Sequence, residues 1–551
     1  MLLQETTAAD DAMSSSLPAP AMLAATAAAV LFGGLVVMAV LYRRNKAEVV
    51  STKGTGGGKG LPPGPRGLPV LGNMHQMLAN KPVHRWLDGL LADAGGGIVR
   101  VRLGPVHVVA ISCPEMAREV LRGRNDAVFA DRPTTFAAES FSVGYRSASI
   151  SPFGDQWRKM RRVLTAEVLA PGTEHRLRAV REGEADHLVR YVRALCGGGG
   201  VDVRHVARHF CGNVIRMLTL GRRHFAAAPP ACGTGGPGRD EAEHVDALFA
   251  TLNYLDAFCV SDYFPALVGL DLDGHERVVR GIMRTLRRLH DPVVEERVEE
   301  WRQLRKAGER RDPADFLDVL ASLNDAAGRP LLTVDEIKAQ IIDIMIATVD
   351  NPSNAAEWAL AEMLNRPEVM ARAVAELDAV VGRDRLVAER DVRELNYLKA
   401  CIREAFRLHP YHPFNPPRVA MADTSVAGYA IPKGSQVILS RVGLGRNPNV
   451  WEDPLEFRPE RHLLDGGGVS LSEPELRFIS FSTGRRGCPG LSLGTVITVM
   501  LLGRLLQGFD WSAPPGVGRV ELREAATSLV RVEPLVLRAT PRLPAHLYEA
   551  K

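Results

Sequence analysis

The feature that most constrains this chain is a glycine-rich stretch around one cysteine, Phe481 to Gly490, with the sequence FSTGRRGCPG. It runs directly into Leu491–Leu506, an apolar segment that we expect to form a buried helix. A cysteine at a helix start lies near free backbone N–H groups, which lower the pKa of its thiol, and the neighbouring Arg486 acts in the same direction. We therefore expect Cys488 to be a thiolate, the form of cysteine that binds metal ions.

The other cysteines show no pattern of their own. The chain has seven cysteines, an odd number, and none of them forms a CxxC pair. This spacing argues against a disulfide framework and against a structural zinc site. We expect the remaining six to be small buried hydrophobic residues: Cys113, Cys196, Cys211, Cys232, Cys259 and Cys401.

The amino-terminal region contains one apolar segment that is long enough to span a membrane. Residues 21–42 carry no charge, and a helix of this length measures about 33 Å, against about 30 Å for the hydrocarbon layer. Basic residues follow it and acidic residues precede it, which leaves the carboxyl-terminal bulk in the cytosol. A cleaved signal peptide is the alternative, but the apolar run is too long and its basic flank lies on the wrong side. We expect residues 1–20 to be lumenal and residues 21–42 to be a single transmembrane anchor.

A tether separates this anchor from the rest of the chain. Residues 51–60 are rich in glycine and flexible in composition, whereas residues 61–69 are rich in proline and cannot be helical. We expect residues 43–69 to form a basic, Gly-rich tether followed by a stiff hinge. Residues 70–551 then form one large domain, although the length alone favours several.

The pattern of residues 70–551 is mostly helical, with a small β region. Residues 98–103 and 106–111 bracket Gly104-Pro105 and predict a β-hairpin. Residues 425–431 and 436–441 also resemble strands, and another pair is expected near the carboxyl terminus. Neither a Rossmann fingerprint nor a P-loop is present, and the net charge of +4 gives no strong case for nucleic acid. Helical spacing marks residues 155–169, 174–196, 241–255, 276–307, 334–347, 355–364, 368–381 and 395–408.

The stretch around Cys488 resembles the signature loop of the cytochrome P-450 superfamily. That signature has five fixed positions, and all of them match: Phe481, Gly484, Arg486, Cys488 and Gly490. The resemblance implies a haem-thiolate fold that binds haem b (iron protoporphyrin IX) and uses O2 as a monooxygenase. It implies that Cys488 is the axial ligand of the haem iron, a bond that favours O–O cleavage.

Further motifs of the same family occur in the expected order. Glu404 and Arg407 form an ExxR pair on one helix face, and the family's third ion-network residue is Arg461 here. The residue after it is His462, where the family usually has phenylalanine. The role of this network in the family is structural.

The resemblance also implies which residues hold the cofactor. Trp157 and Arg161 match a WxxxR motif whose side chains meet the haem propionates, and Arg418 falls at another propionate-binding position. Arg486 belongs to the signature loop itself. The neighbouring basic residues Arg158, Lys159 and Arg162 form either a solvated face or a docking face for an acidic electron donor.

The segment that activates oxygen in this family is unusual here. Ala347 and Asp350 match the family pattern, but Asn351 stands where a threonine hydroxyl normally helps the acid deliver protons. Pro352 follows, and it should kink or open the helix because it has no backbone N–H. A water on the freed carbonyls, with Asn351 as second partner, could replace the hydroxyl. Asp350 and Asn351 are therefore the candidate catalytic residues.

Three stretches resemble one plant group in particular, the amino-acid N-hydroxylases that form aldoximes. They are Asp350–Ala355, His409–Arg418 and Ser480–Cys488. The resemblance implies two N-hydroxylations of an L-amino acid, then loss of water and carbon dioxide. We expect an aromatic substrate, tyrosine or phenylalanine, and a role in cyanogenic glucoside or defence-compound biosynthesis. Candidate substrate contacts are Phe136, Phe141, Tyr145, Arg146, Phe414 and Asn415.

The family resemblance also supplies partners and a location. It implies electron supply from NADPH–cytochrome P-450 reductase and a single-pass anchor in the endoplasmic reticulum membrane, with the catalytic domain in the cytosol. A conventional carbon hydroxylase of a lipid or terpenoid shares the whole scaffold and is the first alternative. A reductase-independent haem-thiolate isomerase that rearranges peroxides is the second, and a haem-dependent sensor is the third.

Overall fold

The computed structural model describes residues 60–223, 237–463 and 467–549 of the chain. The expected membrane anchor, nearly all of the tether and Cys232 lie outside the described residues.

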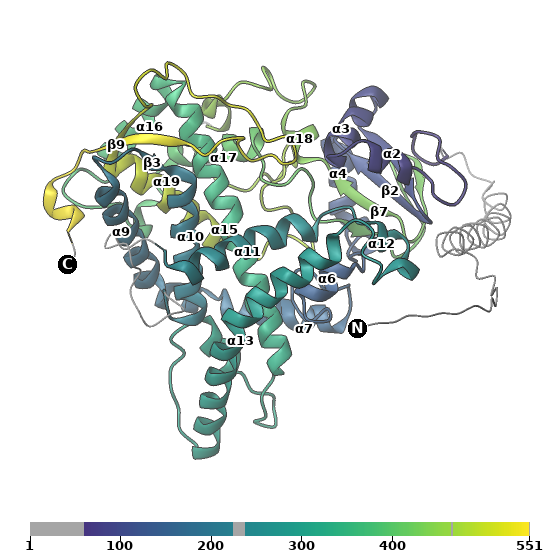
Figure 1. The fold of residues 1–551 in the computed structure, drawn as a ribbon, viewed down its shortest axis with the longest axis horizontal. Coiled ribbons are helices and arrows are strands. Elements are labelled where there is room, and N and C mark those ends of the chain that lie inside the picture. Colours follow the sequence, from purple (N-terminus) through teal and green to yellow (C-terminus); the bar gives the residue numbers. More distant parts are fainter. Residues whose placement is uncertain (1–59, 224–236, 464–466, 550–551) are drawn as a thin grey trace, which may run out of the picture.

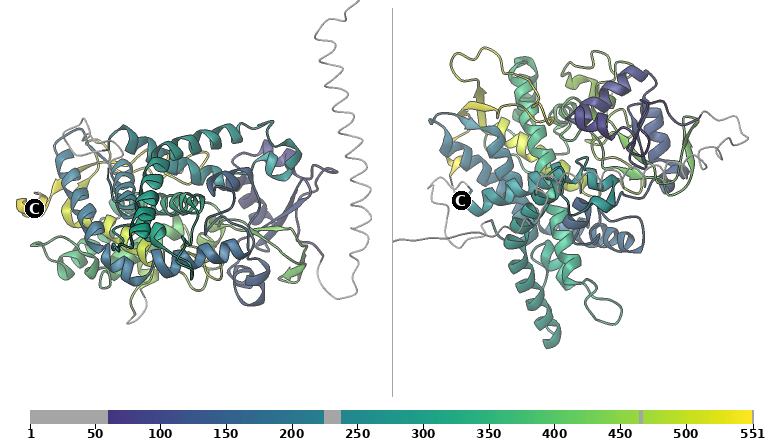
Figure 2. Two further views of the ribbon diagram at one scale, coloured as in Figure 1. Left: turned by 90° about the horizontal axis from the view of Figure 1, so that it is seen from below. Right: turned by 45° about the vertical axis from the view of Figure 1, so that its right-hand side comes forward.

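Helices make up most of the described chain, as predicted, and small sheets lie towards two opposite ends of it (Figures 1 and 2). The π-helical turn Leu164–Val168 extends α7, and single 3-10 turns occur at Pro265–Leu267, Glu389–Asp391, Pro459–His462 and Ala545–Tyr548. The α-helices are α2 (Met74–Ala79), α3 (Val83–Ala94), α4 (Pro114–Leu121), α5 (Gly123–Val128), α6 (Phe136–Phe141), α7 (Asp155–Val163), α8 (Pro171–Arg176), α9 (Arg178–Leu195), α10 (Val203–Leu220), α11 (Arg239–Leu255), α12 (Val260–Tyr263), α13 (His275–Ala307), α14 (Phe316–Ser322), α15 (Val334–Leu364), α16 (Pro367–Val380), α17 (Asn396–Leu408), α18 (Arg441–Gly445) and α19 (Leu491–Gly508).

The strands form three small sheets. The expected hairpin is confirmed, because β1 (Ile98–Leu103) pairs antiparallel with β2 (Val106–Ile111). Strand β7 (Gln436–Leu439) then adds parallel to β2, and β4 (Arg418–Val419) adds antiparallel to β7. The remaining sheets have the orders β3-β9-β8 and β5-β6, from β3 (Val201–Asp202), β5 (Thr424–Val426), β6 (Tyr429–Ile431), β8 (Phe509–Ser512) and β9 (Val536–Pro541).

Helix α15 runs unbroken through Pro352, so the predicted break in this region is wrong. The helix begins with a capping box in which Thr333 and Glu336 exchange side-chain and backbone hydrogen bonds. Pro352 removes one backbone bond, but burial on both sides of it holds the helix together. The Ser353 hydroxyl also donates within the helix, to the carbonyls of Val349 (2.7 Å) and Asp350 (3.1 Å).

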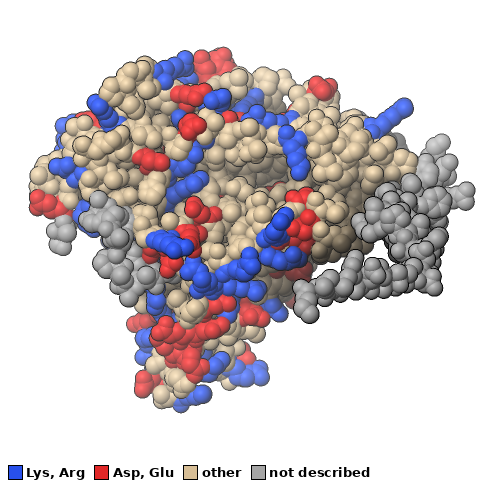
Figure 3. Space-filling view, viewed as in Figure 1, with Lys and Arg blue, Asp and Glu red and all other residues tan. Residues whose placement is uncertain are grey.

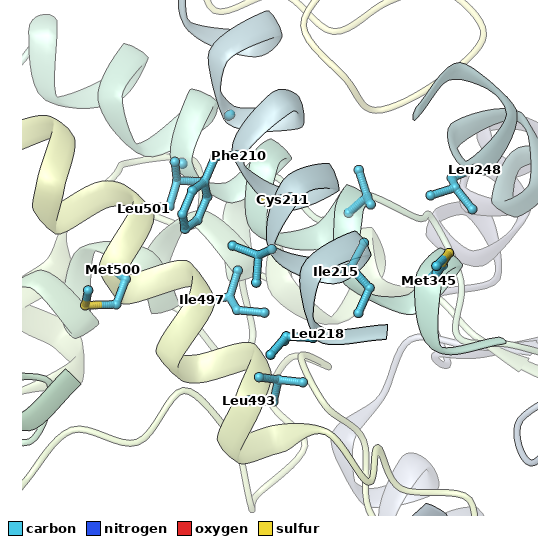
Figure 4. Close-up of a cluster of buried hydrophobic side chains, with 14 of the residues drawn as sticks. Phe210, Cys211, Ile215, Leu218, Leu248, Met345, Leu493, Ile497, Met500 and Leu501 are labelled. Carbon is cyan, nitrogen blue, oxygen red and sulfur yellow. The ribbon is translucent and has the colours of Figure 1, made fainter. Parts of the chain in front are cut away.

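Helix α10 was not predicted from the sequence, although most of its residues are buried. Its apolar side chains Phe210, Ile215 and Leu218 meet Ile497 and Leu501 of α19 in the largest core cluster (Figure 4). Polar residues on α10 are buried as well as apolar ones, among them His209, Asn213 and Arg216. Because this helix has no extended solvent-facing side, its sequence shows little of the alternation that marks surface helices.

Helix α19 is the one described helix that is long and apolar enough to cross a membrane. Of its most apolar 18-residue window, 72% is buried within the protein. It is therefore the core helix that the sequence predicts after Cys488. The segment predicted as residues 174–196 is divided into α8 and α9 at Leu177.

Charged side chains of both signs are interspersed over the face shown in Figure 3. They gather where the end of α13 projects from the body (Figures 1 and 3). Several pair with each other, including Arg302 with Glu299 (2.5 Å) and Arg288 with Asp240 (3.1 Å). This face has no broad field of one sign that would attract a polyanion.

The proline-rich segment is packed onto the domain and lies alongside strand β1. The Arg100 N–H donates to the Pro63 carbonyl (2.7 Å), and the Asn73 amide donates to the Pro65 carbonyl (3.3 Å). A Cβ atom on Gly64 would lie 1.8 Å from the Arg100 carbonyl oxygen. The segment is not helical, as predicted, and it fixes the direction in which the chain enters the domain.

We expect Gly64→Ala to displace this segment, because the added methyl group cannot fit against Arg100. Overpacking of this kind costs about 1–3 kcal/mol. Thermal unfolding followed by circular dichroism should show a lower midpoint, and limited proteolysis should cut faster near residue 64. Gly60→Ala is the matched control, since a Cβ there has nothing within 4 Å. Equal behaviour of the two variants would contradict the packing described here.

Candidate active site

A cavity of about 350 Å³ lies between α15, the start of α19 and the chain around residues 410–418. Cys488 lines it, together with Arg161, Arg418 and Arg486, so the structure brings together four of the five predicted cofactor-binding residues. Most of the lining surface is apolar, and its charged groups are mainly arginines. The cavity can therefore enclose a large apolar group that carries acidic substituents.

The loop before Cys488 is held by backbone bonds and by Asp126. The Cys488 N–H donates to the Phe481 carbonyl (2.8 Å), and the Gly487 N–H donates to the Gly484 carbonyl (2.9 Å). Gly484 has a φ of +75°, and a Cβ there would lie 2.3 Å from an Asp126 carboxylate oxygen. This glycine is needed because another part of the protein approaches it closely.

Cys488 lines the cavity, and its side chain is exposed to the open space there. Removal from bulk water raises the pKa of this thiol above its ordinary value, so the predicted lowering of the pKa by the protein alone is wrong, although the Gly490 N–H and the cations Arg161 and Arg441 act to lower it. Arg161 and Arg441 are the cations that lower this pKa most, and not Arg486 as predicted. Helix-start N–H groups do act as expected. A bound metal cation would remove the thiol proton outright.

Four of the cavity arginines are tied to backbone carbonyls. Arg161 donates to Gly487 (2.7 Å), and Arg486 donates to Ala130 (2.7 Å) and Ser151 (2.8 Å). The guanidinium of Arg132 reaches Pro416 (2.6 Å) and Pro417 (2.7 Å), and that of Arg418 reaches Phe129 (3.4 Å) and Thr483 (3.3 Å). The backbone thus fixes these cations in place before any ligand binds.

Arg418 lies 3.6 Å from the Asp126 carboxylate, whereas the other three cations have no ion pair among the described residues. Burial, and repulsion by Arg132, Arg418 and Arg161, lower the pKa of Arg486. Buried donor atoms without a hydrogen-bond partner remain on Trp157 (Nε1), Arg132 (Nε), Arg418 (Nε) and Arg486 (Nη1). Trp157 does not line the cavity, but its ring lies under the Arg486 guanidinium at 4.6 Å.

A haem group fits this arrangement. Its two propionates would satisfy the unpaired donors around Arg418, Arg486 and Trp157, and its apolar macrocycle suits the rest of the lining. Cys488 supplies the thiolate for the iron. Among the described residues, no cluster of three or more His, Cys, Asp or Glu side chains could hold a bare metal ion instead.

The expected ion network is present and buried beside this site. Glu404 accepts from Arg407 (2.7 and 2.8 Å) and from Arg461 (3.0 Å). His462 also contacts Glu404, at 2.7 Å, so the departure from phenylalanine adds a polar partner. Arg407 continues to the Pro454 carbonyl (2.7 Å). The network joins α17 to the chain that leads towards Cys488.

Helix α15 presents a polar edge to the cavity. Thr348 and Asn351 line it together with Ala347 and Pro352. Asp350 is fully buried and is not among the lining residues. Burial raises its pKa well above the ordinary value, against the opposite effects of Arg208 and Tyr411. Asn351 is therefore placed to touch a ligand, whereas Asp350 can act only through its neighbours.

Several predicted substrate contacts lie elsewhere. Phe136, Phe141, Tyr145 and Arg146 do not line the cavity. Phe141 is fully buried in the core, and Tyr145 donates to the Thr135 carbonyl (3.1 Å). The two residues expected near the site also differ: Asn415 lines the cavity, whereas Phe414 packs in a core cluster beside the β1–β2 hairpin.

Five charged residues that line the cavity were not predicted from the sequence: Arg132, Asp256, Asp262, Asp343 and Arg441. Arg132, Asp256 and Arg441 lie in a connection or at a helix end, where a charged residue is usually solvated. No local pattern distinguished them.

Comparison with known proteins identifies the scaffold. The family model described as Cytochrome P450 matches residues 62–537. The chain belongs to the cytochrome P450 family. A zebra fish cytochrome P450 structure with progesterone superposes with a TM-score of 0.66 at 24% identity, covering 84% of this chain and 100% of that chain. This likeness confirms the P450 fold.

Curated P450 relatives are much more similar in sequence. Tyrosine N-monooxygenase of Sorghum bicolor is 59% identical over 494 residues, covering 89% of this chain and 87% of the relative. Tryptophan N-monooxygenase 1 of Arabidopsis thaliana is 50% identical, and valine N-monooxygenase 1 of Manihot esculenta is 49% identical. Each of these two alignments covers 89% of both chains.

We expect Glu404→Gln to destabilise this P450 strongly. The change leaves the buried cations Arg407 and Arg461 without their carboxylate, and breaking a buried ion pair costs about 3–5 kcal/mol. The yield of protein with a 450 nm band in its reduced carbon-monoxide complex should fall sharply. Glu456→Gln is the control, because that side chain is exposed. A normal yield for Glu404→Gln would contradict the role of the network.

The same carboxylate predicts a response to acid. Its hydrogen bonds with Arg407 and His462 outweigh burial and hold the pKa of Glu404 at about 2, below its ordinary value of 4.5. The contribution of Glu404 to the free energy of unfolding is therefore fully present above pH 4.5, and it is lost as the pH falls towards 2. Denaturant titrations between pH 6 and pH 3 should show a loss of stability that is smaller in Glu404→Gln. An identical pH dependence would contradict this assignment.

Proposed function

We propose that this P450 converts an aromatic L-amino acid, tyrosine or phenylalanine, to its aldoxime. The observation that carries the proposal is the cavity edge of α15, where Asn351 and Pro352 face the ligand space in place of a threonine hydroxyl. Its support is the similarity to relatives named as N-monooxygenases of tyrosine, phenylalanine, tryptophan and valine. The products would serve cyanogenic glucoside or defence-compound biosynthesis.

The reaction consists of two oxidations at nitrogen followed by a fragmentation. Each N-hydroxylation consumes one O2 and two electrons from NADPH and releases one water. The N,N-dihydroxy amino acid then loses water and carbon dioxide to leave the aldoxime. Bound haem supplies the iron at which oxygen is reduced and the substrate nitrogen is oxidised.

Asn351 and the Thr348 carbonyl hold the water through which protons are delivered at this site. Pro352 has no N–H, so the Thr348 carbonyl lacks its usual partner in the helix. Water on this carbonyl, with the Asn351 amide as second partner, forms the proton path that a threonine hydroxyl supplies elsewhere in the family. Asp350 sits behind this edge near Tyr411 and Arg208, and its carboxylate oxygens have no hydrogen-bond partner among the described residues.

The electron donor we propose is NADPH–cytochrome P-450 reductase. Arg158 and Arg162 on the exposed side of α7 offer part of a docking face for an acidic partner, although Arg158 also pairs with Asp155 (2.5 Å). Lys159 does not contribute, since it donates to Glu336 (2.7 and 2.9 Å). We also propose that residues 21–42 anchor the protein in the endoplasmic reticulum membrane as a single span, with the catalytic domain in the cytosol.

A reconstituted assay tests this proposal. Full-length protein, reductase and NADPH are offered each common L-amino acid, and the products are read by mass spectrometry. We expect an aldoxime from tyrosine or phenylalanine. A protein with an intact 450 nm band that turns over lipids or terpenoids, and no amino acid, would instead be a carbon hydroxylase. Turnover without NADPH would indicate the peroxide isomerase.

We expect Asn351→Ala to uncouple the reaction. Loss of one water-mediated hydrogen bond of about 1.4 kcal/mol lowers aldoxime formed per NADPH about tenfold. Asn351→Thr should also change this ratio, because its hydroxyl reaches a different position. Both variants should keep the wild-type 450 nm band and the wild-type affinity for the amino acid. Unchanged coupling in the two variants would contradict the water path.

A further inference from the structure

Arg441 differs from the other arginines of the cavity. The guanidinium groups of Arg132, Arg161, Arg418 and Arg486 each donate to backbone carbonyls. Within the described part of the chain, the Arg441 guanidinium makes neither a hydrogen bond nor an ion pair, and its Nε atom is buried without a partner. It is therefore the one cavity arginine whose donors are all available to a ligand.

The backbone beneath Arg441 is firmly held. The residue opens α18 directly after strand β7, and its N–H donates to the Pro413 carbonyl (2.7 Å). The preceding Ser440 caps α18 by accepting from the Gly443 N–H (2.8 Å) and donates to Asp88 (2.7 Å). The result is a fixed Cα position with a free cationic head, which suits capture of a small anion.

An acidic group lines the same cavity as Arg441. Asp256, the residue that ends α11, lines the cavity, and its carboxylate forms no hydrogen bond or ion pair with the described residues. Asp256 and Arg441 are close enough for each to shift the pKa of the other, yet their charged atoms do not meet within 4.0 Å. A free cation and a free anion thus flank one apolar chamber.

We propose that Arg441 binds the α-carboxylate of the amino-acid substrate and orients its nitrogen for oxidation. This inference rests on the proposed function and assigns the residue that recognises the substrate class. A planar guanidinium holds a carboxylate through two parallel hydrogen bonds, which fixes orientation as well as position. Asp256 provides an opposite charge in the same cavity.

The permanent cofactor has less need of Arg441. Its propionates can be satisfied by donors that are already fixed around Trp157, Arg418 and Arg486. A substrate that arrives and leaves in each cycle is better served by an unpaired side chain. His412 lines the cavity beside Arg441 but stays neutral, because burial and Arg441 lower its pKa to about 3.

The test compares two ligands in two proteins. Wild type and Arg441→Gln, both full length and haem-loaded, are titrated with the amino acid and with its decarboxylated amine, tyramine or phenethylamine. Binding is read from the spectral shift of the haem and by calorimetry. We expect Arg441→Gln to bind the amino acid about 10- to 100-fold more weakly and the amine with unchanged affinity. The affinity of Arg441→Lys for the amino acid should lie between those of wild type and Arg441→Gln, because lysine keeps the positive charge but cannot form the two parallel hydrogen bonds of a guanidinium.

Arg329→Gln is the matched control, since Arg329 is exposed and pairs only with Asp325 in a surface turn. Haem content and the 450 nm band are measured for every variant. The inference would be overturned if Arg441→Gln bound the amino acid and the amine equally more weakly, or if it lost haem while its affinity for the amino acid was unchanged. Either result would place Arg441 at the cofactor. A wild-type protein that responds to no amino acid would overturn the proposed function, and the inference with it.

Discussion

Glu404 carries the interaction on which the rest of the site depends. Its carboxylate is fully buried and receives hydrogen bonds from Arg407, Arg461 and His462, which come from two separate segments. Arg407 passes the connection on to the carbonyl oxygens around Pro454, so a helix and an irregular stretch are held in one register. A segment without regular secondary structure has few backbone hydrogen bonds to hold its conformation. This cluster of charged side chains holds the segment that leads to Cys488.

The second constraint is the contrast between fixed and free cations around one chamber. Guanidinium groups tied to carbonyls cannot follow a ligand, and they favour a cofactor that stays. An unpaired guanidinium on a rigid stem favours a ligand that is exchanged. Helix α15 adds a third constraint. Pro352 has no backbone N–H, so one backbone carbonyl of this helix is left without its usual donor beside the cavity.

Much of this organisation could be predicted from the sequence. The hairpin of β1 and β2, helix α13, the Cys488 loop and the Glu404 network all have local patterns, and the structure confirms them. Helix α10 was missed because burial on nearly every side removes the polar face that makes a helix visible. The predicted break of the helix at Pro352 is wrong, because tertiary packing holds the helix together although the proline removes one of its backbone hydrogen bonds. Arg132, Asp256 and Arg441 gain their meaning only from distant segments that meet at the cavity, which no local pattern records.

The unpaired donors of the cavity have a consequence for the life of the protein. Each buried donor left without a partner costs about 1–3 kcal/mol, and Trp157, Arg418 and Arg486 all carry one. A cofactor that binds the folded chain and satisfies these atoms shifts the folding equilibrium as well as enabling chemistry. Cellular quality control removes the less stable empty form faster. The abundance of this protein should therefore follow the supply of haem, so that a cell short of haem would lack the enzyme rather than hold an idle pool of it.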